Sequence, residues 1–307
     1  MKKILVATEK PFARPAVDGI ADVFKQAGYE LVLLENYKEK KDLLSAVADA
    51  DAMIIRSDKV TEEVLEAGSK LKIVVRAGAG YDNVDIAAST RRDVVVMNTP
   101  GQNSNAVAEL ALGMMVYTAR NYFNGTPGTE LRGKKLGVFA CGNIGKDIAR
   151  IASGFGMEVY GFDPFLERTV LEYAGMMCTA SSEELFSQCQ YISLNAPVVE
   201  QTIRLVNFKL LEKMPESATL VNTARKELVD EDSLLKMFAE RPDFKYISDI
   251  APDCSAEIAE KYPGRFFFTP KKMGAQTSEA NINAGIAAAR QIVGFFEQGD
   301  KTYQVNL

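Results

Sequence analysis

A glycine-rich turn between two apolar segments constrains the fold of this chain more than any other feature. Residues 138–140 are apolar and long enough for a buried strand, and Gly142 and Gly145 follow in a tight turn. The next ten residues show the apolar periodicity of a helix. A second apolar segment, residues 157–162, ends at Asp163. This order of strand, glycine turn, helix, strand and acidic residue is typical of a dinucleotide-binding unit.

Each part of this pattern has a physical role in binding a dinucleotide. Gly142 has no Cβ, so a pyrophosphate can approach the backbone closely, and Gly145 lets the helix pack tightly on the strand. The free N–H groups at the start of the helix attract phosphate. Asp163 can accept hydrogen bonds from both ribose hydroxyls, and its charge would repel a 2′-phosphate, which favours NAD over NADP. Ala140 replaces the first glycine of the usual motif, and a βαβ unit that binds no nucleotide is the alternative.

Composition limits the classes of protein to consider. The length of 307 residues is enough for two domains, and the net charge of −5 argues against nucleic acid or an anionic membrane as partner. The 4 cysteines are scattered without metal-ligand spacing, so we expect no metal and reduced thiols in a cytoplasmic protein. The first apolar segment is too short for a signal peptide or a membrane span. The chain has no histidine, so acid–base chemistry must use other residues.

Predicted strands and helices alternate along the chain, with Thr61 expected to cap the helix that follows it. This alternation predicts an α/β fold of two doubly wound parallel-sheet (Rossmann-like) domains with a cleft between them. We expect a substrate-binding domain over residues 1–98 plus 283–307 and a NAD-binding domain over residues 99–282. A long apolar helix over residues 103–120, with the loop after it, suggests a homodimer formed through the cofactor domains.

Charged side chains collect where strands of the second half end. Arg225, Asp249 and the adjacent Lys271 and Lys272 each follow a predicted strand. Because ligands of such sheets bind beyond the carboxyl ends of the strands, we expect these residues to converge. Arg225 could hold a carboxylate or a carbonyl, Asp249 could accept from a nicotinamide carboxamide, and a lysine could exchange a proton with a substrate hydroxyl. The alternative for each residue alone is a surface ion pair.

The first half carries two similar features at predicted strand ends. Arg56 follows one strand, and the glycine-rich turn at residues 78–80 follows another. A guanidinium can bind an anion through its fork of N–H donors, and a turn can do so through its backbone N–H groups. Both features therefore favour an anionic ligand.

Several segments resemble the signatures of the D-isomer-specific 2-hydroxyacid dehydrogenases. In the second half these are residues 221–231, 248–249, 269–270 and 274–280. In the first half, the segments that are similar to the catalytic portion of that family's phosphoglycerate dehydrogenases are residues 54–57, 75–85 and 97–104. The resemblance covers essentially the whole chain and implies NAD as cofactor and a small anionic substrate, D-3-phosphoglycerate. With nothing after Leu307, it implies a short form without a C-terminal regulatory domain.

The resemblance also implies roles for matching residues. Arg225 would orient the substrate carboxylate and carbonyl, Arg56 would contact the substrate phosphate, and the backbone of residues 77–80 would hold the carboxylate. The substrate-binding residues implied in full are Arg56, Ser57, Arg76, Ala77, Gly78, Ala79, Gly80 and Asn103. The cofactor-binding residues implied are Gly142, Asn143, Ile144, Gly145, Asp163, Asn195, Thr223, Ala224, Asp249, Gly274 and Ala275.

Two departures from the family pattern concern the catalytic step. The family places a histidine just before the Gly-Ala segment, where Lys272 or, in another alignment, Lys271 stands here; we prefer Lys272. The glutamate that pairs with this histidine corresponds to Cys254, with Asp253 and Glu257 nearby. A lysine can accept a proton near neutral pH only if its pKa falls, and burial or a nearby arginine lowers it whereas a glutamate partner raises it. We therefore hypothesise a lysine base that depends on the loss of the glutamate; a degenerate enzyme is the alternative.

Three functions follow from these observations. The first is NAD-dependent oxidation of D-3-phosphoglycerate to 3-phosphohydroxypyruvate, the entry step of serine synthesis, with a lysine as acid and base. The second is the same chemistry on another small D-2-hydroxy acid, such as glycerate, hydroxypyruvate in the reverse direction, or lactate. The third is a catalytically silent protein that senses NAD(H). The missing histidine leaves this function open, whereas the presence of Arg225, Asp249 and Arg56 argues against it.

Overall fold

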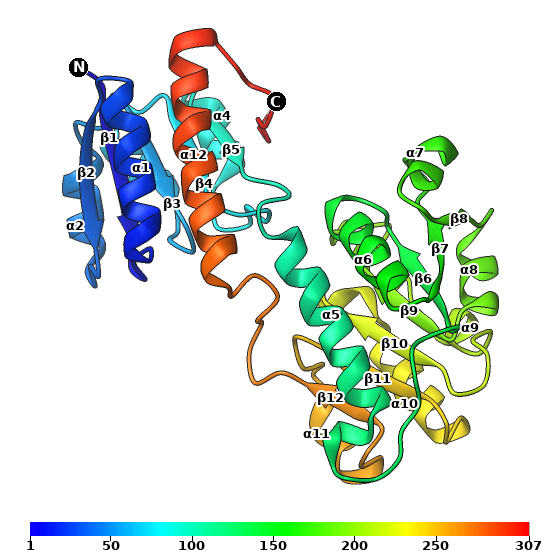
Figure 1. Ribbon diagram of the computed structural model, residues 1–307. Helices are drawn as coiled ribbons and strands as arrows, with labels where there is room; N and C mark the ends of the chain where they lie inside the picture. Colours follow the sequence, from blue (N-terminus) through cyan, green and yellow to red (C-terminus); the bar gives the residue numbers. More distant parts are fainter. Residues whose placement is uncertain (307) are drawn as a thin grey trace. The chain divides into compact units, whose positions relative to one another are not determined.

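The computed structural model describes residues 1–306 (Figure 1). The chain forms two compact units, one of residues 1–103 with residues 276–306 and one of residues 104–275. Each unit is built on its own parallel sheet, of 5 strands in the first and 7 in the second. The predicted fold class, α/β with two doubly wound parallel sheets, is confirmed, whereas the domain limits and the cleft stay predictions.

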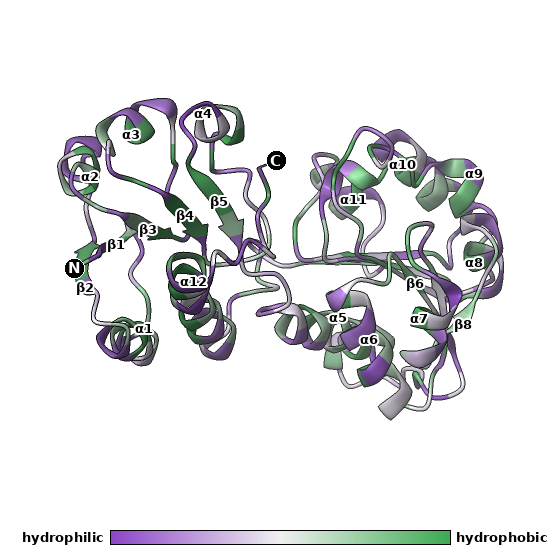
Figure 2. Cartoon of the chain, turned by 90° about the horizontal axis from the view of Figure 1, so that it is seen from above, coloured by the Kyte–Doolittle hydropathy of each residue, from purple (hydrophilic) through white to green (hydrophobic). Residues whose placement is uncertain are grey.

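The sheet of the first unit has the strand order β2-β1-β3-β4-β5. Its strands are β1 (Lys3–Thr8), β2 (Glu30–Glu35), β3 (Ala52–Ile55), β4 (Ile73–Arg76) and β5 (Val95–Asn98). Its helices are α1 (Arg14–Gln26), α2 (Lys40–Val47), α3 (Glu62–Ala67), α4 (Ile86–Arg91) and α12 (Ser278–Gln298). Helices α1 and α12 cover one face of the sheet and α2, α3 and α4 cover the other (Figure 2), so the central strands are buried on both faces.

The sheet of the second unit has the strand order β12-β11-β10-β9-β6-β7-β8. Its strands are β6 (Lys135–Phe139), β7 (Glu158–Phe162), β8 (Met177–Cys178), β9 (Tyr191–Leu194), β10 (Thr219–Asn222), β11 (Lys245–Ser248) and β12 (Phe266–Phe268). Its helices are α5 (Ser104–Ala119), α6 (Asn143–Gly154), α7 (Arg168–Tyr173), α8 (Ser182–Gln188), α9 (Phe208–Leu211), α10 (Glu231–Glu240) and α11 (Ser255–Lys261), with short 3₁₀ helices η1 (Asn121–Phe123) and η2 (Lys226–Leu228).

The order of the second sheet reverses between β6 and β9. Strands β7 and β8 continue from β6 in one direction, and β9 to β12 continue in the other. In a parallel sheet such a reversal opens a crevice at the carboxyl ends of the two strands, where dinucleotides bind. The fold thereby places the glycine turn after β6 at this point of the second unit.

Several local predictions differ from the structure. The helix after the glycine turn begins at Asn143 rather than at residue 146, with Gly142 as its N-cap. Thr61 stands at the N-cap of α3, but its side chain makes no capping hydrogen bond and its buried Oγ1 has no partner among residues 1–306. The predicted Thr61 cap is therefore wrong. Within residues 1–306, no helix combines the length and the apolar character that crossing a membrane requires.

Candidate active site

The glycine turn joins β6 to α6 through an unusual backbone conformation. Ala140 has a φ of 68°, which lies in the left-handed region that L-residues with a side chain rarely adopt. This explains why glycine is the usual residue at the position. The chain therefore forms the turn at a conformational cost of roughly 1–2 kcal/mol at Ala140.

The two glycines of the turn are needed for different reasons. A Cβ at Gly145 would lie 2.5 Å from the Ala140 carbonyl oxygen and 2.9 Å from Val138 Cγ1, so helix α6 can pack this closely on β6 only with glycine. A Cβ at Gly142 would meet no atom within 4 Å. Gly142 thus borders open space at the start of α6, where the first N–H groups of the helix have no partner within it. These features fit a pyrophosphate.

Asp163 follows β7 and is held against the same turn. Its Oδ2 accepts a hydrogen bond from the Cys141 N–H at 2.9 Å, and its Oδ1 accepts one from the Phe165 N–H at 2.9 Å. Each carboxylate oxygen keeps a second lone pair. The carboxylate is therefore fixed beside the turn and still able to accept from the hydroxyls of a ribose.

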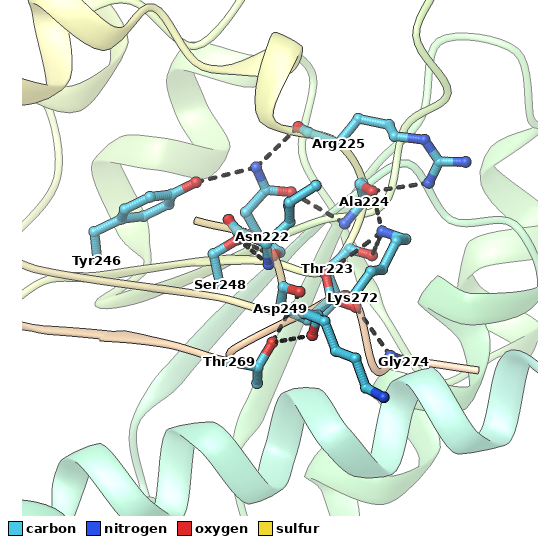
Figure 3. Close-up of polar contacts among 12 residues, drawn as sticks. Asn222, Thr223, Ala224, Arg225, Tyr246, Ser248, Asp249, Thr269, Lys272 and Gly274 are labelled. Carbon is cyan, nitrogen blue, oxygen red and sulfur yellow. Dashed lines mark hydrogen bonds and ion pairs between the residues drawn. The ribbon is translucent and has the colours of Figure 1, made fainter. Parts of the chain in front are cut away.

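The ends of β10, β11 and β12 meet in one network of hydrogen bonds (Figure 3). Asn222 and Ser248 are fully buried, and the Ser248 hydroxyl donates to the Asn222 carbonyl at 2.8 Å. The Asp249 carboxylate is also fully buried, and it accepts from the Gly274 N–H at 3.0 Å. Thr269 Oγ1 lies 2.8 Å from the Asp249 carbonyl oxygen. Three strand ends are thus bonded to one another around a buried carboxylate.

Lys272 and Arg225 both reach this network. Lys272 Nζ lies 2.7 Å from the Ala224 carbonyl oxygen and 3.5 Å from Asp249 Oδ1. Arg225 Nη1 donates to the same Ala224 oxygen at 2.9 Å. The side chain of Lys271 is exposed and forms no hydrogen bond with residues 1–306. The geometry therefore favours Lys272 over Lys271 as the lysine of this site.

The surroundings of Lys272 lower its pKa. Burial is the largest cause, and the positive charge of Arg225 acts in the same direction. The negative charges of Asp249 and Glu227 oppose the shift without cancelling it. The side chain is still 41% exposed, so the amine remains accessible from solvent. A lysine in this state is a better proton acceptor near neutral pH than an ordinary one.

None of the three residues near the family's glutamate position bonds to Lys272. Asp253 forms an ion pair with Lys226, and Glu257 pairs with Lys261 at 2.7 Å. Cys254 donates its backbone N–H to Glu231 Oε2 at 2.8 Å, and burial, followed by the Glu231 charge, raises the pKa of its thiol to about 12. The carboxylate next to Lys272 is that of Asp249.

In the first unit, Arg56 is held by several groups. Its Nη1 donates to the carbonyl oxygens of Lys10 and Pro11, each at 3.2 Å, and its Nη2 donates to the side chain of Asn281. The guanidinium lies 5.1 Å from the centroid of the Phe12 ring. Burial lowers its pKa, but an arginine remains charged. The other two of its five N–H donors, one on Nε and one on Nη2, have no hydrogen-bond partner among residues 1–306 and can bind a ligand.

The turn after β4 presents backbone donors, but not all those expected. Ala77 donates its N–H to the Ile55 carbonyl at 2.8 Å, so this N–H is not available for a substrate carboxylate. The N–H groups of residues 78–80 form no hydrogen bond with residues 1–306. Gly78 has a φ of 148°, which residues with a side chain rarely adopt, so glycine is favoured there. Three adjacent backbone N–H groups without a partner are donors of the kind that an anion can accept from.

The other predicted residues lie as follows. Asn195 follows β9 and donates from Nδ2 to the Ser193 carbonyl at 3.1 Å. Thr223 is buried in the turn after β10, and its carbonyl oxygen lies 3.5 Å from Lys272 Nζ. Ser57 is exposed after β3, and Asn103 and Ala275 are half-buried at the limits of the units. Ile144 is in the first turn of α6.

Sequence reasoning missed the buried polar residues that support these side chains. Asn222, Tyr246, Ser248 and Thr269 are not among the predicted site residues, although an asparagine directly before a turn is a recognisable signal for a hydrogen bond from its side chain to the backbone two residues on. Tyr246 carries no such signal, because its contact with Asn222 depends on the pairing of β10 and β11.

Comparison with known proteins identifies the family. Residues 12–306 match the model of the D-isomer specific 2-hydroxyacid dehydrogenase catalytic domain. The chain belongs to this family. Its members are NAD-dependent dehydrogenases, so the predictions of family, enzyme class and cofactor are confirmed.

Individual relatives carry more specific names. An NAD⁺-bound 3-phosphoglycerate dehydrogenase of Entamoeba histolytica is 47% identical, with 100% of this chain and 99% of that chain covered and a TM-score of 0.88. The hydroxypyruvate reductase of Thermotoga maritima is 34% identical over 86% of this chain and 90% of its own length. The D-3-phosphoglycerate dehydrogenase of Methanocaldococcus jannaschii is 34% identical over 82% of this chain, which spans 51% of that protein. This chain thus covers about half of that dehydrogenase.

Proposed function

We propose that this dehydrogenase oxidises D-3-phosphoglycerate to 3-phosphohydroxypyruvate with NAD⁺. The observation that carries the proposal is the likeness to the Entamoeba histolytica 3-phosphoglycerate dehydrogenase over essentially the full length of both chains. The reaction removes a hydride from C2 of the substrate and a proton from its hydroxyl. Bound NAD⁺ supplies the hydride acceptor, and the chain supplies binding, orientation and the proton acceptor.

The cofactor site of this proposal is the glycine turn of the second unit. The N–H groups at the start of α6, with the open space at Gly142, would hold the pyrophosphate. Asp163 would accept from the adenosine ribose and exclude a 2′-phosphate. The buried carboxylate of Asp249 would accept from the nicotinamide carboxamide, and residues 274–275 would line that end of the site.

Arg225 and Lys272 would act on the reacting end of the substrate. The Arg225 guanidinium makes a single hydrogen bond within residues 1–306, to the Ala224 carbonyl oxygen, so most of its N–H donors are free to hold a carboxylate and polarise a carbonyl. Lys272 would accept the hydroxyl proton in oxidation and return it in reduction. The base is the neutral amine, so the lowered pKa increases its fraction at neutral pH.

Arg56 and the turn at residues 78–80 support an anionic substrate. Arg56 is fixed by three hydrogen bonds and offers two further N–H donors, which suits a phosphate. The free N–H groups of residues 78–80 would hold a carboxylate. A second candidate function, reduction of hydroxypyruvate, is favoured by the likeness to the Thermotoga maritima reductase, whose length this chain covers to 90%.

We further propose a homodimer formed through α5 and residues 121–130. The second unit presents an aromatic cluster there, in which Tyr117 packs on Tyr122 and Phe123 at ring-centroid distances of 5.3 Å. Phe123 is 65% exposed, and an exposed aromatic residue of this kind is typical of an interface. A cytoplasmic location remains a prediction.

The test compares phosphorylated and unphosphorylated substrates in both directions. NADH formation is measured with D-3-phosphoglycerate, D-glycerate and D-lactate, and NADH consumption with 3-phosphohydroxypyruvate and hydroxypyruvate. We expect the phosphorylated pair to be preferred, and Arg56→Gln to raise KM for that pair while leaving D-glycerate kinetics unchanged. Equal turnover of hydroxypyruvate and its phosphate would support the reductase instead. Absence of turnover with intact NADH binding would contradict both and support a sensor.

Paired lysine variants test the acid–base assignment. We expect Lys272→Ala to lose activity in both directions while NADH binding is retained, because only the proton transfer is removed. Lys271→Ala is the matched variant, since it removes the same charge one residue away. Loss of activity in Lys271→Ala alone would transfer the role to that residue.

A further inference from the structure

We infer that Asn222 is a positioning residue of this site: its side-chain amide fixes the turn at residues 223–225 so that one carbonyl, that of Ala224, holds both Arg225 and Lys272. The inference rests on the roles proposed above for these two cations. Asn222 itself touches neither of their side-chain charges.

The hydrogen bonds of the Asn222 amide determine the shape of the turn. Asn222 is fully buried at the end of β10. Its Oδ1 accepts from the Ala224 N–H at 3.0 Å, and its Nδ2 donates to the Arg225 carbonyl at 2.9 Å. Because one partner is a donor and the other an acceptor, the amide fits in one orientation only. The two bonds lie on either side of the Ala224 carbonyl along the chain and therefore restrict its rotation.

The Ala224 carbonyl oxygen is the shared acceptor of the site (Figure 3). Lys272 Nζ lies 2.7 Å from it and Arg225 Nη1 lies 2.9 Å from it. Two cations so close repel one another, so their common position depends on an acceptor that does not move. A side chain that fixes this carbonyl therefore controls the distance between the two cations.

The same arrangement controls the charge of Lys272. The groups that face it are Arg225 in the turn, Asp249 at the end of β11 and Glu227 in η2. Burial and Arg225 favour the neutral amine, whereas Asp249 and Glu227 favour the ammonium. If the turn loosens, water enters and Arg225 moves away, and both changes favour the ammonium. Loss of Asn222 should therefore move the titration of Lys272 to higher pH.

Tyr246 provides a matched control. Asn222 Nδ2 lies 3.2 Å from the Tyr246 hydroxyl, which is a third contact of the amide and is not part of the turn. Tyr246→Phe removes one polar group from the same buried region and leaves both bonds to the turn in place. Asn222→Ala and Tyr246→Phe should both lower stability, but only the first should act on Lys272.

The experiment uses the full chain and two independent readouts. The first is kcat and kcat/KM against pH for Asn222→Ala, Asn222→Ser and Tyr246→Phe, with the substrate that the wild type prefers. The second is the rate at which Lys272 is modified by an amine-acylating reagent against pH, located by mass spectrometry and independent of turnover. Asn222→Ser serves if Asn222→Ala does not fold, because serine can accept from the Ala224 N–H but is too short to reach the Arg225 carbonyl.

For the Asn222 variants we expect kcat to fall about 10- to 100-fold, as for a modest misplacement of reacting groups, with little change in NADH affinity. The titration of Lys272 should rise by about one pH unit in both readouts, and Tyr246→Phe should leave it unchanged. An unshifted Lys272 titration in the Asn222 variants would overturn the inference. If instead Lys272→Ala keeps wild-type activity, the proposed function of Lys272 fails, which is a separate result.

Discussion

The two glycines of the turn after β6 allow a sharp test, because the structure predicts opposite effects of the same substitution three residues apart. In Gly145→Ala, the new methyl group would lie 2.5 Å from the Ala140 carbonyl oxygen and 2.9 Å from Val138 Cγ1. Neither a backbone oxygen at a strand end nor a buried valine can move freely. Overpacking of this kind costs about 1–3 kcal/mol, and the better helix propensity of alanine offsets at most about 1 kcal/mol.

The net effect of Gly145→Ala should be a destabilisation of about 1–2 kcal/mol. For a domain of this size that corresponds to a Tm lower by about 2–8 °C. Gly142→Ala should differ, because its methyl group meets no atom within 4 Å and the residue has an extended backbone with a φ of −67°. Its Tm should stay close to that of the wild type, but its methyl group would occupy the space proposed for the pyrophosphate and weaken NADH binding at least about tenfold.

Thermal unfolding without cofactor, followed by circular dichroism, measures the first effect. NADH fluorescence measures the second, and the chain contains no tryptophan to overlap with it. An unchanged Tm for Gly145→Ala would refute the packing argument. Wild-type NADH affinity for Gly142→Ala would refute the placement of the pyrophosphate, whatever the result at Gly145.

Four further predictions follow from single contacts. Ala140→Gly should raise the free energy of unfolding by about 0.5–1 kcal/mol, measured by urea titration, because relief of the left-handed strain exceeds the extra entropy of glycine in the unfolded chain. Thr61→Val should stabilise by about 1 kcal/mol in the same assay, because the buried Oγ1 has no partner among residues 1–306; a loss would show that the hydroxyl caps α3. Asp163→Asn should lower the ratio of KM for NADP⁺ to KM for NAD⁺ by about tenfold, because removing the negative charge relieves roughly 1–4 kcal/mol of repulsion with a 2′-phosphate. The pKa of Lys272 is lowered in the folded state, so just below the ordinary lysine pKa of 10.5 the unfolded chain binds one more proton than the folded chain. The free energy of unfolding of the wild type therefore increases with pH in that window. Lys272→Met should make this increase smaller, which urea titrations at several pH values would measure.

The fold could be predicted from the sequence because its central strands are buried on both faces. Such strands are short apolar segments, as in β3 and β9, where every residue is buried. The missed elements are those with little to bury. Helix α11 buries only Ile258, and strand β8 has two residues, neither of them fully buried. Short elements of this kind show no measurable periodicity.

The residues of the candidate site could be predicted from the sequence, but the hydrogen bonds among them could not. Placing Arg225, Asp249 and a lysine at one sheet edge needs only the rule that parallel strand ends meet. Choosing between Lys272 and Lys271 requires knowledge of the backbone path after β12. There Thr269 Oγ1 lies 2.7 Å from the Lys271 carbonyl oxygen, a contact that the sequence alone does not reveal. The hydrogen bond of the Ala77 N–H to Ile55 could not be predicted either, because it depends on the register of β3 and β4. Those of Arg56 to Lys10 and Pro11 depend on the path of the loop after β1.

The two departures from the family pattern can be understood as one change. A carboxylate partner stabilises a protonated base, which suits a histidine but would raise the already high pKa of a lysine further. Here Asp253 and Glu257 are paired with Lys226 and Lys261, and Cys254 carries no charge while its thiol pKa stays near 12. Asp249 lies 3.5 Å from Lys272, and burial together with Arg225 outweighs the charges of Asp249 and Glu227. Returning a glutamate by Cys254→Glu should therefore move the pH limb of the oxidation upward, because the carboxylate would stabilise the ammonium form of Lys272. A faster oxidation at neutral pH in this variant would refute the neutral amine of Lys272 as the base.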